Sequence, residues 1–294
     1  MSNLKKTTGI LAVVALFVIF LLTACRKENS AVQTQTAKKL SVYLTDDPCN
    51  YDSVFIDIRY VEVKVDTSEE HMNDDHFDDQ DGDQDDDHHD HDQYGKWDTL
   101  NIKAGVYNIM ALRNGADTLL GTANLPKGSI RKIRVTLGTN NRVVVAGISH
   151  PLNLYPGTNN YVYIKLGDGD LDEDHHNNQV NVWLDFNVCE SIVSDNGQYY
   201  LRPIIKPFGR EETGEIEGRV LPNDAEAMVK AYNDSDSAIA KPEEDDGEYK
   251  IEGLTPGTYS LLFKGANGYK DTLLTNIQVQ KGEETKVPLI TLKK

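Results

Sequence analysis

The chain has 294 residues, and its 47 acidic and 30 basic side chains give a net charge of −17. So acidic a protein repels nucleic acid and anionic lipid headgroups, which excludes nucleic-acid binding and membrane binding through a basic patch. Its apolar residues are mostly Val, Ile, Leu and Tyr that alternate with polar ones, which is the period of half-buried strands. The composition therefore predicts an all-β protein that is long enough for two domains.

The first element is a signal peptide over residues 1–24. It has a basic beginning, an apolar stretch over residues 10–22 and a lipobox, Leu22-Thr23-Ala24-Cys25. The apolar stretch is shorter than the roughly 20 residues that span a bilayer, although an uncleaved anchor helix is the alternative. Cleavage makes Cys25 the lipidated N-terminus of a bacterial lipoprotein, and the lipid is then its tie to the membrane.

Residues 25–38 lack apolar periodicity and are interpreted as a tether between the lipid and the first domain. We expect a lipid-anchored protein of the outer membrane that is exposed at the cell surface. Arg26, Lys27 and Glu28 only partly resemble the signal that sends lipoproteins to the surface, so the periplasmic face remains an alternative.

Strand patterns begin at residue 39 and predict a first domain over residues 39–208. The buried positions change phase between Ile58 and Val61, which predicts a β-bulge or a sharp bend. Strands are expected around residues 40–44, 54–58, 61–65, 133–137, 142–145, 161–166, 180–186 and 199–205, with one short helix over 106–113. Short strands at regular spacing favour an antiparallel β-sandwich.

An acidic, histidine-rich insertion interrupts this domain over residues 66–96. Residues 68–93 hold eleven Asp, two Glu and five His, with no Lys or Arg, and no hairpin connection needs this length. The side chains that could close around one ion are His71, His76, His88, His89 and His91, with Asp75, Asp87 or Asp90. Imidazole ligands favour Zn, Ni or Cu over Ca.

A second candidate metal cluster consists of His175 and His176 with Asp174, which could also meet the first cluster in space. The acidic run that precedes these histidines is not an EF-hand loop, because Glu173 stands where the glycine is required. We expect the insertion to bind divalent metal weakly. The alternative is that both segments are solvated tips that keep a surface protein soluble.

A second, smaller β domain is expected over residues 212–294, after a break in the apolar pattern near residues 208–213. Its strands are expected at 216–220, 229–232, 249–251, 259–263, 277–279 and 287–292. The fold prediction is therefore two antiparallel β-sandwich domains in tandem, after a signal peptide and a short tether.

The first domain contains the motifs Leu44-Thr45-Asp46-Asp47-Pro48, Asn114-Gly115, Asp117-Thr118-Leu119-Leu120-Gly121, Leu184-Asp185-Phe186 and Leu201-Arg202-Pro203. In this order they resemble the family called domain of unknown function 4382. The resemblance covers about residues 39–206. It implies a β-sandwich found largely in lipoproteins of Bacteroidota, with no established activity.

Cys49 and Cys189 are the only cysteines after Cys25. Disulfides persist in exported proteins, but the spacing leaves both a bridge and two free thiols open. Where the family pattern favours small residues, this chain has these two cysteines. The paired departures favour a bridge.

The second domain has a pattern of turn and strand residues at Gly214, Gly218, Gly253, Leu254, Pro256, Gly257, Tyr259 and Gly282. With these residues it resembles a carboxypeptidase regulatory-like module of transthyretin-like fold. The resemblance implies a noncatalytic appendage of a secreted or surface protein.

The sequence contains no nucleophile elbow, no H-E-x-x-H pair and no phosphate-binding glycine loop. We therefore expect a noncatalytic envelope lipoprotein that binds divalent metal. The alternative is an adhesin-like module that binds a glycan or an envelope protein, with metal binding incidental. Trp97, Trp183 and the 14 tyrosines could form a sugar-stacking platform, although strand aromatics more often pack against their neighbours.

Overall fold

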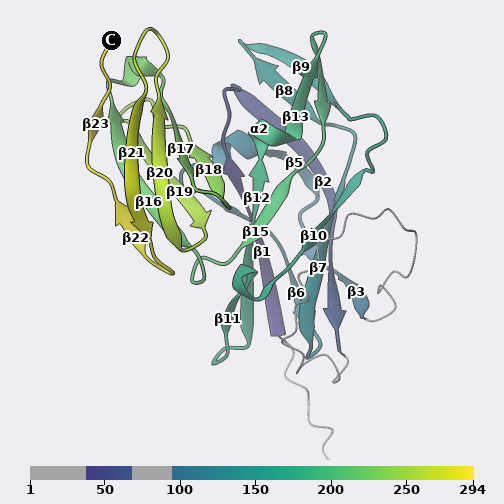
Figure 1. Ribbon diagram of the computed structural model, residues 1–294. Coiled ribbons are helices and arrows are strands. Elements are labelled where there is room, and N and C mark those ends of the chain that lie inside the picture. The colour runs from purple at the N-terminus through teal and green to yellow at the C-terminus, as the bar shows by residue number, and fades with distance from the viewer. Residues whose placement is uncertain (1–37, 68–94) are drawn as a thin grey trace, which may run out of the picture. The chain divides into compact units, whose positions relative to one another are not determined.

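The computed structural model describes residues 38–67 and 95–294, all of which belong to one compact unit, residues 36–294. They form two β-sandwiches (Figure 1), and the predicted all-β fold class is confirmed. In the described ranges, helical segments are limited to α2 (Val188–Ser191) and three 3-10 turns, η3 (Ile109–Leu112), η4 (Asp168–Asp170) and η5 (Asn223–Ala225). No helix within these ranges is long and apolar enough to cross a membrane.

The first sandwich contains a six-stranded and a nine-stranded sheet. The six-stranded sheet has the order β11 (Asp172–Asp174), β12 (Gln179–Asn187), β1 (Lys38–Asp47), β6 (Thr118–Leu125), β4 (Asn101–Ile102), with β15 (Ile205–Phe208) paired to β12. The nine-stranded sheet has the order β10 (Tyr161–Lys165), β7 (Ser129–Leu137), β2 (Ser53–Asp66), β8 (Arg142–Val145), β9 (Ile148–Leu154), β14 (Gln198–Leu201), β13 (Ile192–Asp195), with β3 (Lys96–Thr99) and β5 (Gly105–Asn108) paired to β2. Most pairs are antiparallel, but β1 pairs with β12 in parallel, as does β9 with β14.

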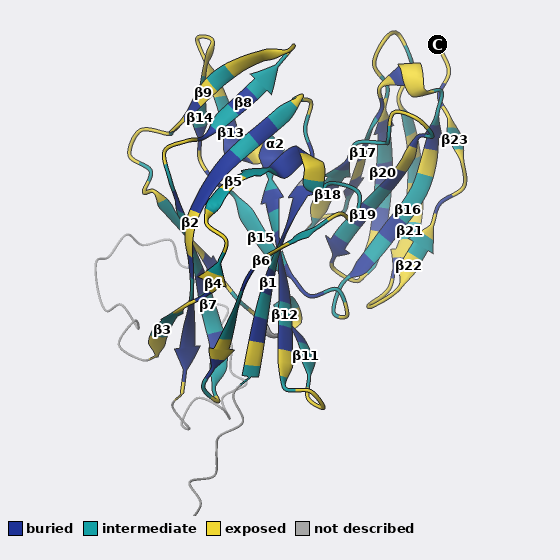
Figure 2. Cartoon of the chain, turned by 180° about the vertical axis from the view of Figure 1, so that it is seen from behind, coloured by how far each residue is buried: buried dark blue, intermediate teal, exposed yellow. Residues whose placement is uncertain are grey.

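One hydrophobic core lies between these two sheets. Alternate residues of the central strands are buried (Figure 2), such as Leu40 and Val42 in β1 and Val61 and Val63 in β2. The predicted change of phase in β2 is confirmed, because its pairing with β7 shifts register between Ile58 and Tyr60. The bulge lets both halves of this long strand direct their apolar side chains into the same core.

The short helix predicted over residues 106–113 is wrong. Residues 105–108 form β5, which pairs with β2, and only the 3-10 turn η3 follows. Val106 is β-branched and Tyr107 is aromatic, and both residue types favour strands. Pairing with β2 therefore decides for a strand over a helix.

The run predicted as one strand over residues 199–205 is divided into β14 and β15. β14 pairs within the nine-stranded sheet, whereas β15 pairs with β12 of the six-stranded sheet. The chain therefore crosses between sheets at residues 202–204. Pro203, which has no N–H group for a sheet ladder, lies at the crossing.

The second sandwich has two four-stranded sheets and its own core. One sheet contains β19 (Glu248–Leu254), β16 (Gly214–Leu221), β22 (Glu284–Lys286) and β23 (Ile290–Thr291). The other has the order β18 (Ser237–Ala240), β17 (Met228–Tyr232), β20 (Gly257–Lys264), β21 (Thr272–Val279). Its buried residues form a cluster separate from that of the first sandwich, with Tyr249, Tyr259 and Phe263 among the largest.

Candidate functional site

Most of the predicted metal ligands lie outside the described residues. These are His71, His76, His88, His89, His91, Asp75, Asp87 and Asp90, and the same holds for the lipidation site Cys25. Their predicted roles stay predictions.

The second predicted cluster lies at the turn between β11 and β12. The His175 side chain is 80% exposed, and its Nδ1 lies 3.7 Å from a carboxylate oxygen of Glu173. Asp174 accepts hydrogen bonds from the Asn177 side chain and from the backbone N–H groups of Asn177 and His176, which lower the pKa of Asp174. In the part of the chain that the structure describes, no three His, Cys, Asp or Glu side chains gather as a group that could hold a metal ion.

A disulfide joins Cys49, which follows β1, to Cys189 in α2. The Cα atoms are 5.0 Å apart, and the bridge joins positions 140 residues apart in sequence. The spacing left both a bridge and two free thiols open, the departures from the family pattern favoured the bridge, and the structure has the bridge.

The outward face of the six-stranded sheet carries a row of aromatic side chains. The strand register aligns Tyr43 of β1 with Trp183 of β12, and Trp183 with Phe208 of β15. The ring centroids of Tyr43 and Trp183 are 4.9 Å apart, and those of Trp183 and Phe208 are 6.2 Å apart. Trp183 is only 8% exposed although it points away from the core, so another part of the fold covers it.

Arg210, in the linker between the two sandwiches, lies over this row. Its guanidinium carbon is 4.7 Å from the centroid of the Trp183 ring. Its Nη2 lies 3.1 Å from an oxygen of Asp117 and 3.0 Å from an oxygen of Glu252 in β19. The indole N–H of Trp183 donates to the same oxygen of Asp117. Arg210 therefore connects the first sandwich to the second through charged hydrogen bonds and ring stacking.

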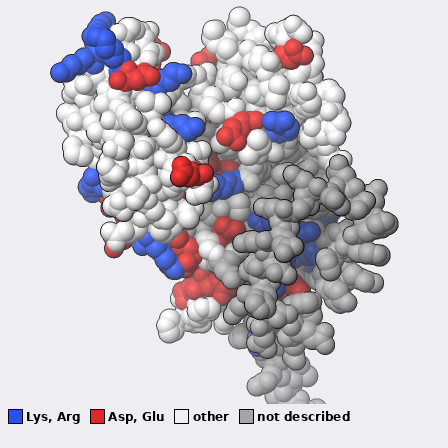
Figure 3. Space-filling view, viewed as in Figure 1, with Lys and Arg blue, Asp and Glu red and all other residues white. Residues whose placement is uncertain are grey.

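Further hydrogen bonds and ion pairs join the sandwiches. Glu243 accepts hydrogen bonds from Arg113 at 3.1 Å and from the Asn114 amide at 2.7 Å, and these bonds, that of Arg113 foremost, lower the pKa of Glu243. Lys206 of β15 donates to Asp236, in the turn before β18, at 2.5 Å. Figure 3 shows acidic and basic side chains next to each other at several points of the visible face, which is the arrangement in which ion pairs form.

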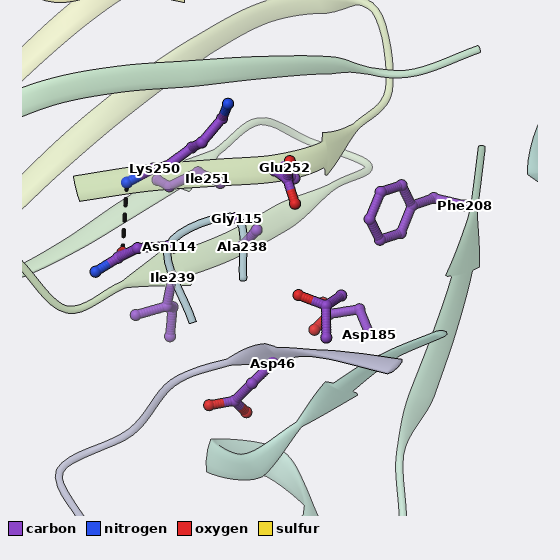
Figure 4. Close-up of a pocket in the computed structure, with 11 residues that line it drawn as sticks. Asp46, Asn114, Gly115, Asp185, Phe208, Ala238, Ile239, Lys250, Ile251 and Glu252 are labelled. Atoms are coloured by element: carbon purple, nitrogen blue, oxygen red, sulfur yellow. Dashed lines mark hydrogen bonds between the residues drawn. The ribbon is translucent and has the colours of Figure 1, made fainter. Parts of the chain in front are cut away.

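A cavity of about 20 Å³ lies at this junction (Figure 4). Asp46 of β1 and Asp185 of β12 line it from the first sandwich, and Lys250 and Glu252 line it from the second. Burial raises the pKa of the Glu252 carboxyl although Arg210 opposes this effect. The volume is enough for about one water molecule and far below the several hundred Å³ of an organic ligand site. The junction is thus a structural contact. No local sequence pattern indicates it, because its members are scattered along the chain.

Two larger hollows border the second sandwich, with volumes of about 330 and 400 Å³. Glu211, Glu215 and Glu283 line the first, and Asp224, Glu226 and Glu244 line the second. Both are open and mainly acidic. Acidic groups alone do not define a ligand.

The two tryptophans lie in different places. Trp183 belongs to the covered junction, whereas Trp97 of β3 lies beside Tyr163 and Arg134 on the nine-stranded sheet, with ring centroids of Trp97 and Tyr163 5.9 Å apart. Of the two tryptophans, only Trp97 is in a position to contribute to a surface platform.

The sequence model of one protein family matches residues 37–203, and its description is a domain of unknown function, DUF4382. No curated protein matches the chain. Among solved structures, the TIE protein of Bacillus anthracis is 13% identical, with a TM-score of 0.20, over 88% of this chain and 34% of that one. The chain therefore spans about a third of the length of that protein.

Two pilins also match. The shaft pilin SpaA of Lactobacillus rhamnosus GG is 10% identical, with a TM-score of 0.21, over 88% of this chain and 99% of the pilin. A minor pilin of Streptococcus agalactiae is 14% identical, with a TM-score of 0.21, over 86% of this chain and 95% of the pilin. Likeness at these scores carries no argument about function.

Proposed function

Since the chain belongs to the family of domain of unknown function 4382, whose description assigns no activity, we propose that it is a noncatalytic, metal-binding lipoprotein of a bacterial outer membrane. The lipobox that ends at Cys25 supports the lipid anchor. The Arg26-Lys27-Glu28 sequence matches the surface signal only in part, so the cell surface is the proposed location and the periplasmic face is the alternative.

The observation that carries metal binding is the composition of residues 68–93. Five imidazoles stand among eleven Asp and two Glu, with no basic side chain to compete for them. Neutral imidazole binds Zn, Ni and Cu, and the surrounding carboxylates attract divalent cations by their charge. The proposed activity is the capture of such ions outside the cell.

Metal titration tests this proposal. Zn, Ni and Ca are titrated calorimetrically into a soluble protein that begins at residue 26 and into a variant with all five histidines of residues 68–93 replaced by Ser. We expect the parent to bind Zn and Ni with micromolar affinity. The variant should bind both metals at least about tenfold more weakly, because imidazole is the selective ligand. Binding should also weaken below about pH 6, where histidine becomes protonated.

The matched control replaces His175 and His176, the exposed histidines of the β11–β12 turn, by Ser. This protein should bind as the parent does. Equal heats in the parent and in the variant that lacks the five histidines would refute metal capture by residues 68–93.

The anchor is tested by Cys25→Ser. Lipid labelling and membrane association should both be lost, since three acyl chains would hold the parent almost permanently. Protease treatment of intact cells then distinguishes the two faces of the membrane. A lipidated protein that intact cells protect from protease would contradict the surface location and leave the anchor in place.

A further inference from the structure

The sequence contains three Asn-Gly pairs, Asn114-Gly115, Asn196-Gly197 and Asn267-Gly268. In each pair both residues have a positive φ angle, which is the conformation of the tight turns that Asn-Gly favours. An asparagine before glycine is also open to a spontaneous reaction with its own backbone, because glycine has no Cβ atom to hinder the approach. The three pairs share this local chemistry, so any difference between them comes from the surrounding fold.

The reaction converts asparagine to an acid without an enzyme. The backbone nitrogen of the glycine loses its proton and bonds to Cγ of the asparagine, and the side-chain nitrogen takes up a proton and leaves as ammonia. Water then opens the resulting succinimide ring at one of its two carbonyl groups, which gives aspartate or isoaspartate. Since the side chain must turn toward the glycine nitrogen, hydrogen bonds that hold the side chain elsewhere oppose the reaction.

The junction between the sandwiches protects Asn114-Gly115. The Asn114 amide nitrogen donates to the Lys241 carbonyl oxygen at 2.9 Å and to a carboxylate oxygen of Glu243 at 2.7 Å. Its side-chain oxygen accepts from the Lys250 N–H at 3.4 Å. Gly115 is crowded as well, because a Cβ atom there would stand 2.9 Å from Cδ of Lys250. This side chain would have to give up three hydrogen bonds, one of them to a charged group, before it could react.

Asn267-Gly268, between β20 and β21, is exposed but held. The Asn267 amide nitrogen donates to the Asp224 carbonyl oxygen at 2.8 Å. The hydroxyl of Tyr269, which follows the pair, lies 3.0 and 2.9 Å from the two carboxylate oxygens of the same Asp224. Both ends of this turn are therefore tied to η5, so the asparagine is partly protected.

Asn196-Gly197 has neither form of protection. It is the two-residue turn of the β13–β14 hairpin, in which Asp195 pairs with Gln198, and both of its residues are exposed. A Cβ atom on Gly197 would meet nothing within 4 Å. Among residues 38–67 and 95–294, no hydrogen-bond partner holds the Asn196 side chain. Of the three pairs, this one alone combines a free side chain with an open glycine.

We propose that Asn196 is a site of spontaneous deamidation, and that the fold protects Asn114 and Asn267 from the same reaction. The aspartate product keeps the turn, because Asp-Gly suits the same conformation as Asn-Gly, and it adds a negative charge. The isoaspartate product adds an atom to the backbone of a two-residue turn, which disturbs the register of Asp195 with Gln198. This modification is independent of metal binding by residues 68–93.

Peptide mapping by mass spectrometry tests the proposal on the folded protein that begins at residue 26. The protein is incubated at neutral and at mildly alkaline pH, and digestion in acid then preserves both products for chromatography. We expect Asn196 to convert at least about tenfold faster than Asn114 and at least about threefold faster than Asn267, since broken hydrogen bonds raise the barrier. Conversion should be faster at the higher pH, because the glycine nitrogen must first lose its proton.

The unfolded chain is the matched control. In guanidinium chloride with dithiothreitol, the three pairs should convert at similar rates, because only their shared local sequence then matters. A variant, Glu243→Ala, removes one partner of the Asn114 amide. In the folded variant, conversion at Asn114 should become faster, while conversion at Asn196 should not change.

Three results would overturn the inference. The first is an equal rate at the three pairs of the folded protein. The second is an Asn196 that stays an amide in the folded protein and converts in the unfolded chain, since the hairpin turn would then protect it as the junction protects Asn114. The third is an unchanged rate at Asn114 in folded Glu243→Ala, which would contradict protection by hydrogen bonds.

Discussion

At the scale of single residues, a buried hydroxyl in the second sandwich is notable. Tyr249 of β19 is 1% exposed, and its hydroxyl has no hydrogen-bond partner among residues 38–67 and 95–294. Burial raises the pKa of Tyr249 above its ordinary value. A Cβ atom on its strand partner Gly218 would stand 2.5 Å from that hydroxyl, so the ring fits only because this position of β16 is glycine.

Tyr249→Phe should therefore stabilise the protein. Removal of a buried hydroxyl without a partner relieves its desolvation cost, and we expect the free energy of unfolding to rise by about 1 kcal/mol. The measurement is urea unfolding followed by circular dichroism. Tyr259→Phe is the matched control, because its hydroxyl donates to Asp236 at 2.7 Å and approaches the Thr255 carbonyl at 2.8 Å. That control should lose about 1 kcal/mol. A loss in both variants would contradict the explanation.

At the scale of elements, the local sequence pattern predicts strands well where apolar and polar residues alternate along the chain. The alternation in β1 and β2 and the bulge between Ile58 and Tyr60 follow from the sequence, since one face of each strand must be apolar. Local pattern fails at β5 and at the division of β14 from β15. In those places the pairing partner lies far away in sequence and decides the conformation.

The disulfide joins two elements that are far apart in sequence, β1 and α2. It links the end of β1 to α2 across 140 residues, so its loss enlarges the conformational freedom of the unfolded chain. The double variant Cys49→Ser/Cys189→Ser should lose about 3 to 5 kcal/mol of unfolding free energy. Urea unfolding measures this loss, and dithiothreitol should destabilise the parent but not the variant. Equal sensitivity of both proteins to the reductant would contradict a stabilising role of the bridge.

At the scale of the whole molecule, ion pairs hold the second sandwich against the six-stranded sheet. Asp236, whose side chain is 8% exposed, receives hydrogen bonds from Lys206, from the Thr255 N–H and from the Tyr259 hydroxyl. Burial alone would raise the pKa of Asp236, but these bonds and the charge of Lys206 outweigh it and lower the pKa. The stabilisation is therefore present above the ordinary carboxyl pKa of about 4 and is lost as pH falls through the lower folded value.

Asp236→Asn should remove this acid dependence. At pH 7 we expect the free energy of unfolding of the variant to be lower than that of the parent by about 1.5 to 3 kcal/mol, the size of a hydrogen bond to a charged group. Between about pH 5 and pH 2, acidification should lower the free energy of unfolding less in the variant than in the parent. Urea unfolding at each pH measures both effects. Asp234→Asn, an exposed neighbour in the same turn, is the matched control and should behave as the parent. Parallel pH profiles for the parent and Asp236→Asn would contradict the assignment.

The sequence by itself determined the all-β class, the β2 bulge, the family resemblance and the concentration of metal-ligating residue types in residues 68–93, because each of these depends on neighbours along the chain. Only the tertiary structure decided the row of Tyr43, Trp183 and Phe208, the contacts of Arg210 and the packing of Trp97 against Arg134 and Tyr163. Their members come from strands that are far apart in sequence, and they meet only through the pairing register. That register depends on how two sheets share one core, which no local pattern encodes.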